Sequence, residues 1–276
     1  MNARGITRGL CLGDLQGMAR GYANLGVLAL EQNQWVEAAD YFQRSLETHQ
    51  RTGDMQGVTI ASGNLGVVYT NLGDISQARQ FLERSLQGAL TTADSFNAAQ
   101  AYKNLGRALI YAEEWALASE HLQKALAIYE ELEDNELLAD VYELLGEAAL
   151  GSGDLNGAET LAQRAMEMAL QSESGQEERE ARAWRLMGMV QREQGHLDKA
   201  MTSLLKSRDM FEIQGNHLEL GQVILELARL HLALGHKEEA QRLGEECQGI
   251  CQSIQAALIC WWAADFLAGL NPQETQ

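Results

Sequence analysis

The sequence repeats itself with a period of about 40 residues, and no other feature restricts the possible folds as strongly. A small residue marks the same point of each repeat, and the six markers are Gly26, Gly66, Gly106, Gly146, Gly188 and Ala228. Leucine or methionine precedes every marker, and alanine follows every marker twelve residues later. Units of this length stack on one another, because a single unit cannot bury its apolar face alone. The period therefore predicts an array of repeats.

The pattern inside one repeat predicts two helices joined by a turn. Aspartate recurs at Asp14, Asp54, Asp94 and Asp134, where it can cap the first helix of a repeat. Glycine lies seven residues after four of the six markers and is expected to end that helix. Trp35 and its equivalents are expected to begin the second helix and to fill the turn. We expect the marker and the later alanine to face each other where the two helices cross.

The composition agrees with a helical chain and disfavours two classes of partner. The one proline, Pro272, lies close to the last residue, and helix interiors tolerate few prolines. A net charge of −18 argues against binding to nucleic acid or to anionic membranes. The sequence has no apolar run of ~18 residues that would span a membrane, and the first residues lack the apolar core of a signal peptide. The four cysteines show no regular spacing, so reduced thiols and a cytoplasmic location are expected.

The order of small and aromatic residues resembles the tetratricopeptide repeat. In the first repeat this pattern is carried by Tyr22, Leu25, Gly26, Ala29, Ala38, Phe42 and Ser45. In the third and fifth repeats it is carried by Tyr102, Leu105, Gly106, Ala118, Leu122 and Ala125, and by Trp184, Met187, Gly188, Ala200, Leu204 and Ser207. The resemblance covers about residues 13–270. The period of 40 exceeds the family's usual 34 and is similar to the long-helix members found in Pins-type polarity adaptors, kinesin light chains and bacterial regulators.

The resemblance implies an all-α fold, a right-handed α-solenoid of about six helix–turn–helix repeats plus a C-terminal capping helix. The expected repeats are 13–52, 53–92, 93–132, 133–174, 175–214 and 215–254. A partial helix of a truncated repeat is expected at 1–12, the capping helix at 255–271 and a tail at 272–276. The sixth repeat has Gly244 where a bulky residue is usual, so we expect it to pack less well. A two-residue excess within 172–180 makes that junction the one candidate hinge.

Asparagine returns two residues before the marker in three successive repeats, at Asn24, Asn64 and Asn104. A side-chain amide both donates and accepts hydrogen bonds, which suits it to the backbone of an extended peptide. The resemblance implies this role, because the position lies on the concave face of tetratricopeptide proteins and commonly serves there to hold a peptide. The alternative is a hydrogen bond between repeats that fixes their register. The other residues assigned to the peptide-binding face are Lys103, Arg107, Asn71, Tyr111, Arg182 and Arg185.

Charged residues on the predicted first helices allow two interpretations. The resemblance implies that Lys103 and Arg107 can hold a carboxylate of a ligand. The next repeat offers Glu143 and Glu147 at the equivalent positions, and Arg185 follows one repeat later. A charge ladder between repeats is therefore the alternative, and we favour it.

The fourth repeat is strongly acidic. Residues 125 to 163 contain ten Asp or Glu and no Lys or Arg. Such a run is usually a solvated surface. If it selects a partner, the partner is expected to carry basic residues near one end.

The segment 256–270 has Asp265 as its one charged residue. A terminal helix of a repeat array is normally polar on its outer face. Either a tryptophan packs on the sixth repeat, or the helix offers an apolar surface for self-association or for a missing neighbour. The residues assigned to such an oligomer contact are Trp261, Trp262 and Phe266.

Residue patterns typical of catalysis or metal binding do not occur. His196 and His236 are equivalent turn residues and the other four histidines lie at unrelated repeat positions, while Cys247 and Cys251 lack partners at metal-ligand spacing. Neither a phosphate-binding loop nor a nucleophile elbow is found. We therefore expect no enzyme, no metal and no cofactor. The sequence predicts a protein-interaction scaffold that binds a peptide or helix of a partner protein in its concave groove. The alternatives are a sensor or regulatory array of a larger signalling or transcription-regulating protein, and a homo-oligomeric scaffold.

Overall fold

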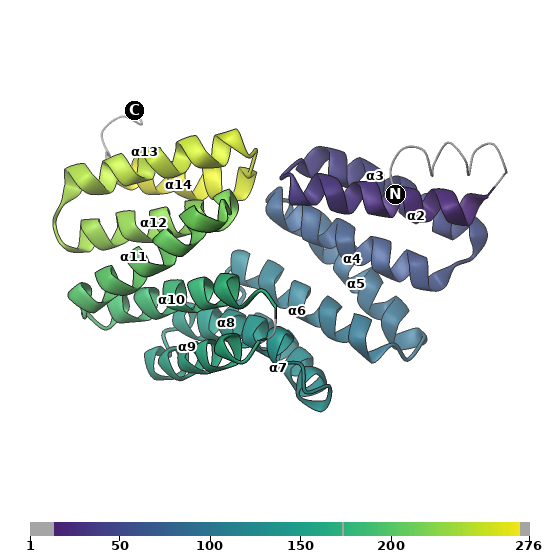
Figure 1. The fold of residues 1–276 in the computed structure, drawn as a ribbon, viewed down its shortest axis with the longest axis horizontal. Helices are drawn as coiled ribbons and strands as arrows, with labels where there is room; N and C mark the ends of the chain where they lie inside the picture. Colours follow the sequence, from purple (N-terminus) through teal and green to yellow (C-terminus); the bar gives the residue numbers. More distant parts are fainter. Residues whose placement is uncertain (1–13, 173, 271–276) are drawn as a thin grey trace. The chain divides into compact units, whose positions relative to one another are not determined.

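The structure is a computed structural model that describes residues 14–172 and 174–270, and all regular structure in them is helical (Figure 1). The expected partial helix at 1–12, Cys11 and the tail at 272–276 lie outside the described residues. No helix among the described residues is both long enough and apolar enough to cross a membrane. The helices are α2 (Leu15–Glu31), α3 (Trp35–Thr52), α4 (Met55–Asn71), α5 (Ile75–Thr91), α6 (Ser95–Tyr111), α7 (Trp115–Glu131), α8 (Asn135–Gly151), α9 (Leu155–Leu170), α10 (Gln176–Glu193), α11 (Leu197–Gln214), α12 (His217–Ala233), α13 (Lys237–Ser253) and α14 (Ala257–Leu270).

The helices follow the 40-residue period as antiparallel pairs, which confirms the all-α solenoid. We call the first helix of each pair the inner helix and the second the outer helix. The chain divides into two compact units. Unit 1 comprises the described residues up to Glu114 together with Glu120–Ile128, and unit 2 comprises Trp115–Ser119 and the described residues from Tyr129 onwards.

The expected hinge at 172–180 does not coincide with this division. The backbone N–H and hydroxyl of Ser174 both donate to Glu136, at 3.0 and 2.6 Å. Arg179 donates to the carbonyl of Glu136 at 3.0 Å and to the carboxylate of Asp140 at 3.2 Å. These hydrogen bonds join the two-residue excess to α8, so the expectation of a loose junction there was wrong.

Aspartate caps begin the inner helices as predicted. The carboxylates of Asp14, Asp54, Asp94 and Asp134 each accept a hydrogen bond from the backbone N–H three residues later, at 2.8 to 3.1 Å. This satisfies one of the N–H groups that the first turn of a helix leaves without a partner. The outer helices begin at Trp35 and its five equivalents, also as predicted.

The residue seven positions after each marker adopts a left-handed backbone conformation in all six repeats. Glycine occupies four of these sites, with φ between 79° and 85°, as at Gly73 and Gly153. Asn33 and Glu113 occupy the other two, with φ of 57° and 58°. Glycine adopts this conformation without steric cost, which explains why the sequence places it at the end of most inner helices.

The markers are small because a bulky outer-helix residue lies over them. A Cβ added at Gly66 would lie 2.3 Å from Cγ of Leu82 and 3.3 Å from the carbonyl oxygen of Ala78. Leu122 covers Gly106 in the same way. We expected the marker to face the alanine twelve residues later, and it does approach the backbone carbonyl of that alanine. Its closest contact, however, is with the side chain of the residue 16 positions after the marker.

A hydrogen bond between the two helices of a repeat accompanies this close approach. The hydroxyls of Ser45, Ser85 and Ser207 donate to inner-helix carbonyl groups 26 residues earlier, at 2.7 to 3.0 Å. In the sixth repeat the thiol of Cys247 takes the same role and donates to the carbonyl of Gly221 at 3.2 Å.

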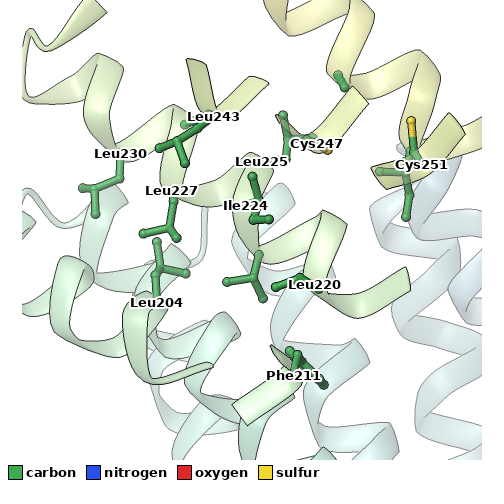
Figure 2. Close-up of a cluster of buried hydrophobic side chains, with 14 of the residues drawn as sticks. Leu204, Phe211, Leu220, Ile224, Leu225, Leu227, Leu230, Leu243, Cys247 and Cys251 are labelled. Carbon is green, nitrogen blue, oxygen red and sulfur yellow. The ribbon is translucent and has the colours of Figure 1, made fainter. Parts of the chain in front are cut away.

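The sixth repeat shares a core of buried side chains with the helices on either side of it. Leu204, Leu220, Ile224, Leu227 and Leu230 belong to a cluster of buried residues that joins α11, α12, α13 and α14 (Figure 2). Side chains of α14 occupy the space beside Gly244. A Cβ added at this glycine would lie 2.8 Å from Leu267 and 3.2 Å from Phe266.

A disulfide joins α13 to α14. Cys251 and Cys260 are nine residues apart in sequence, with their Cα atoms 5.4 Å apart. The expectation of reduced thiols is therefore wrong for this pair, while Cys247 is a buried free thiol as expected. Burial raises the pKa of the Cys247 thiol to about 12.

Candidate functional site

The three asparagines lie at equivalent points of α2, α4 and α6, and all of them belong to unit 1. The Asn24 side chain is exposed, whereas Asn64 and Asn104 are half-buried. Within the described part of the chain, no hydrogen bond joins any of these three amides to another group. The alternative interpretation, a hydrogen bond between repeats that fixes their register, therefore finds no support.

Each asparagine belongs to a stripe of four accessible positions along its helix, at spacings of four, three and four residues that keep them on one side. All twelve residues in these stripes are exposed or half-buried. We call this surface the amide face. Its residues are Arg20, Asn24, Val27 and Glu31 on α2, Ile60, Asn64, Val67 and Asn71 on α4, and Gln100, Asn104, Arg107 and Tyr111 on α6.

Apolar side chains lie beside the amides on this face. Val27 is 45% exposed and Ile60 is 43% exposed, so both are available to another molecule. Asn71 is engaged in part, because its amide nitrogen donates to the carbonyl of Val67 in the same helix at 3.1 Å.

Three other predicted residues are less open. The Lys103 side chain is buried, with 9% exposure, whereas Arg107 and Tyr111 are half-buried. All three interact with other groups of the protein. The amides of Asn24, Asn64 and Asn104 are thus the most available polar groups among the predicted residues of unit 1.

In unit 2 five of the twelve equivalent stripe positions are buried, among them all three that correspond to the asparagines. The residues equivalent to the asparagines are Leu144, Leu186 and Glu226, and all three are buried. The predicted site residues Arg182 and Arg185 are only 9% and 4% exposed. These two arginines belong to unit 2 and are buried, whereas the accessible amides belong to unit 1.

Arg185 lies at the centre of an ion-pair network between α8, α10 and α12. Its guanidinium contacts Glu143 at 2.8 Å, Glu147 at 3.0 Å and Glu219 at 2.8 Å, and it also donates to Gln222. This confirms the part of the predicted charge ladder in which Arg185 pairs with Glu143.

Arg182 extends the network to Asp140, with a nitrogen–oxygen distance of 2.8 Å. Arg179 contacts the same carboxylate at 3.2 Å. The acidic inner-helix residues of the fourth repeat are therefore balanced by arginines of the fifth. Exposed carboxylates remain around the turn that precedes the fourth repeat, at Glu130, Glu131 and Glu133.

A second ion-pair cluster surrounds Glu226, which the sequence analysis did not single out. Burial disfavours its ionised form, but Arg229 and Arg192 outweigh this effect and hold the pKa of Glu226 below its usual value. A signal was present in the sequence, since Arg192 and Glu226 lie 34 residues apart on neighbouring inner helices. Glu226 occupies the same repeat position as Asn104, but its carboxylate contacts Arg192 and Arg229 and is buried.

The residues predicted for an oligomer contact separate into two groups. Trp262 and Phe266 are half-buried and pack against the core cluster of the sixth repeat. Trp261 is 63% exposed. A tryptophan does pack on the sixth repeat, and Trp261 is the predicted contact residue that stays available. The described residues include no group of three or more His, Cys, Asp or Glu able to hold a metal ion.

A family model described as "Tetratricopeptide repeat" matches the chain in five overlapping segments, at residues 17–91, 58–131, 97–171, 137–213 and 179–253. No curated protein matches the sequence.

Solved structures similar to this chain share its fold at low sequence identity. A Rap protein complexed with competence and sporulation factor is 14% identical, with a TM-score of 0.69, over 95% of this chain and 79% of that chain. The Rap conjugation gene regulator of plasmid pLS20, complexed with the Phr* peptide, is 13% identical, with a TM-score of 0.68, over 93% and 73%. A signal transduction ATPase with a tetratricopeptide repeat sensor from Pyrococcus horikoshii is 17% identical, with a TM-score of 0.62, over 96% and 40%.

Proposed function

The chain belongs to the tetratricopeptide repeat family, and from this premise we propose that it is a non-enzymatic interaction scaffold whose amide face binds an extended segment of a partner protein. The single observation that carries the proposal is the set of three equivalent amides, on successive inner helices, that make no hydrogen bond within the described chain. Buried polar groups normally have a hydrogen-bond partner, and a segment that covers this face can supply one for each amide.

The chemistry of the amide face favours a peptide backbone over a particular side chain. An asparagine amide can donate to a peptide carbonyl and accept from a peptide N–H at the same time. Three of them in equivalent positions suit a ligand with a regular alternation of donors and acceptors, which an extended peptide has. The apolar surface of Val27 and Ile60 is available to the side chains of such a peptide.

The comparisons support this proposal only at the level of fold. Two of the similar solved structures contain a bound factor or peptide, and both have the all-α repeat fold of this chain. The amide face of unit 1 is our assignment for this chain and rests on its own residues.

The experiment selects peptides from a random-sequence display library against the purified chain and measures the enriched peptides by titration calorimetry. The double variant Asn64→Ala/Asn104→Ala is expected to bind them about 5- to 150-fold more weakly, since each lost hydrogen bond contributes roughly 0.5–1.5 kcal/mol. Asn156→Ala, at an exposed position of α9 in unit 2, is the matched control and is expected to bind normally. Unchanged affinity in the double variant contradicts the proposal.

The alternative of a homo-oligomeric scaffold rests on Trp261. Light scattering of the wild type and of Trp261→Glu tests it, because Trp262 and Phe266 contribute to the core and their substitution would disturb folding. A monomeric wild type excludes this alternative.

A further inference from the structure

A cavity of about 380 Å³ lies in unit 1 between the C-terminal ends of α3 and α5 and the first turns of α4. Its lining includes Gln50, Met55, Val58, Arg84, Gly88 and Thr91. None of these residues belongs to the amide face, so the cavity is a separate feature of the unit.

One residue of the cavity lining, Gly88, carries no side chain. The residue 22 positions after the marker is bulky and apolar in four repeats, as Ile128, Met168, Met210 and Ile250, and it is Gly88 in the second. A Cβ at Gly88 would lie 2.2 Å from Oγ1 of Thr59. Thr59 itself is unusual, since the other five repeats have alanine or glycine at that position. In this repeat the Thr59 side chain lies where a side chain at position 88 would begin, and Gly88 lines the cavity.

The cavity has an apolar floor and one charged residue at its edge. Val58 is buried, whereas Met55 is 55% exposed, which is unusual for a side chain of this kind. Arg84 is the one charged residue in the lining. With the Gln50 amide oxygen turned toward it, Arg84 donates a 3.2 Å hydrogen bond to Gln50.

Arg84 differs from most arginines of this acidic chain. Within the described residues, no carboxylate lies within 4.0 Å of the Arg84 guanidinium, whereas the neighbouring arginines of unit 1, Arg44 and Arg79, both have carboxylate partners. An accessible apolar cavity beside a cation without an anionic partner favours a ligand that combines an apolar group with a carboxylate.

We propose that this cavity is a second docking site, which receives an aliphatic or aromatic side chain of a partner protein while an adjacent aspartate or glutamate pairs with Arg84. The volume lies at the small end of the range for ligand pockets, which suits a single anchoring side chain. Met55 is flexible and polarisable and adapts to side chains of different shape. The proposal goes beyond the amide face and does not depend on it.

The test uses the full chain with ¹³C-labelled methionine methyl groups and follows the Met55 resonance, identified from a Met55→Leu variant. The probes are two blocked dipeptides, acetyl-Glu-Phe-amide and its neutral counterpart acetyl-Gln-Phe-amide. The acidic probe is expected to shift the resonance saturably and to bind about two- to five-fold more tightly than the neutral probe, the gain expected for an exposed ion pair. Arg84→Met is expected to abolish this difference.

Filling the cavity provides the second arm. Thr59→Ala/Gly88→Met restores the residue types of the other repeats and is expected to abolish the response to both probes, whereas Thr59→Ala alone keeps it. Asn64→Ala, on the amide face, is expected to leave the response unchanged, which separates this proposal from the previous one. Should the double variant fail to fold, the Arg84→Met comparison still decides the question.

Three results would overturn the proposal. The first is a Met55 resonance that neither probe shifts saturably. The second is equal affinity of the wild type for the two probes. The third is a Met55 resonance that shifts when the chain alone is concentrated, because the occupant would then be a second copy of the chain.

Discussion

Arg185 of α10 donates a 2.8 Å hydrogen bond to Glu143 of α8, and neither side chain is more than 5% exposed. In sequence, Glu143 and Arg185 each precede the residue of their repeat that is equivalent to the asparagines of unit 1. The two units therefore use equivalent helices in different ways. Unit 1 leaves amides accessible, and unit 2 joins its inner helices through buried ion pairs.

Removing Arg185 is expected to destabilise unit 2 strongly. The variant Arg185→Leu leaves Glu143, Glu147 and Glu219 close together without their common cation. Loss of one partner from a buried ion pair typically costs about 3–5 kcal/mol, and a lower urea midpoint measured by circular dichroism is the expected result. Arg164→Ala removes a pair in which both side chains are more than half exposed and should change the midpoint little. Equal effects of the two variants would contradict a structural role for the network.

The stability of unit 2 is expected to fall in acid. The pKa of Glu226 is lower in the folded chain than in the unfolded chain, because Arg229 and Arg192 overcome the cost of its burial. A lowered pKa contributes stability above the unfolded value of about 4.3 and loses it as the pH falls through the folded value. Thermal unfolding between pH 7 and pH 3 should therefore show a declining Tm.

The variant Glu226→Gln provides the control for this acid dependence. It cannot ionise, so it should be less stable than the wild type at pH 7 and should lose less stability on acidification. A wild type and variant with parallel pH profiles would show that Glu226 does not contribute.

Reduction of the disulfide is expected to lower the stability of the C-terminal helices. Cys251 and Cys260 close a loop with a sequence separation of nine, for which loop-closure entropy gives roughly 2–3 kcal/mol. Thermal unfolding with and without a reductant, compared with Cys260→Ser, measures this contribution. The variant should match the reduced wild type and should not respond to the reductant. Cys247 is buried, so it should resist alkylation until the chain unfolds.

The close contact between Gly66 and Leu82 gives a prediction about packing. Gly66→Ala places a methyl group against Leu82 and close to a backbone carbonyl, so a destabilisation of about 1–3 kcal/mol is expected. Gly249→Ala is the matched control on α13, because no atom lies within 4 Å of the added Cβ. That variant should gain roughly 0.5–1 kcal/mol from the better helix propensity of alanine. Chemical unfolding of both variants checks the difference.

Most of the fold could be predicted from the sequence, because its determinants are local. The caps at Asp14 and Asp54 and the turn glycine at Gly73 act within a few residues of their own position. Glu113 adopts the same left-handed backbone conformation as Gly73. Because it is not a glycine, the sequence alone did not predict this conformation at position 113. The ladder pair of Arg185 with Glu143 was predictable because equivalent positions of neighbouring repeats meet.

Features that depend on contacts outside the repeat pattern were missed. The disulfide joins Cys251 to Cys260 on different helices, and no spacing rule connects them. Gly244 suggested a defect in the sixth repeat, yet side chains of α14 fill the space. The cavity beside Gly88 was also missed, because the contact between this position and Thr59 on another helix becomes visible only in the structure.

The most direct measurement of the central claim records the side-chain amide resonances of Asn24, Asn64 and Asn104 by NMR while a library-selected peptide is added. The account predicts that the resonances of these three amides shift together and saturate at one peptide concentration, while those of Asn156 on α9 stay unchanged. It is contradicted if a peptide known to bind leaves the three amide resonances in place.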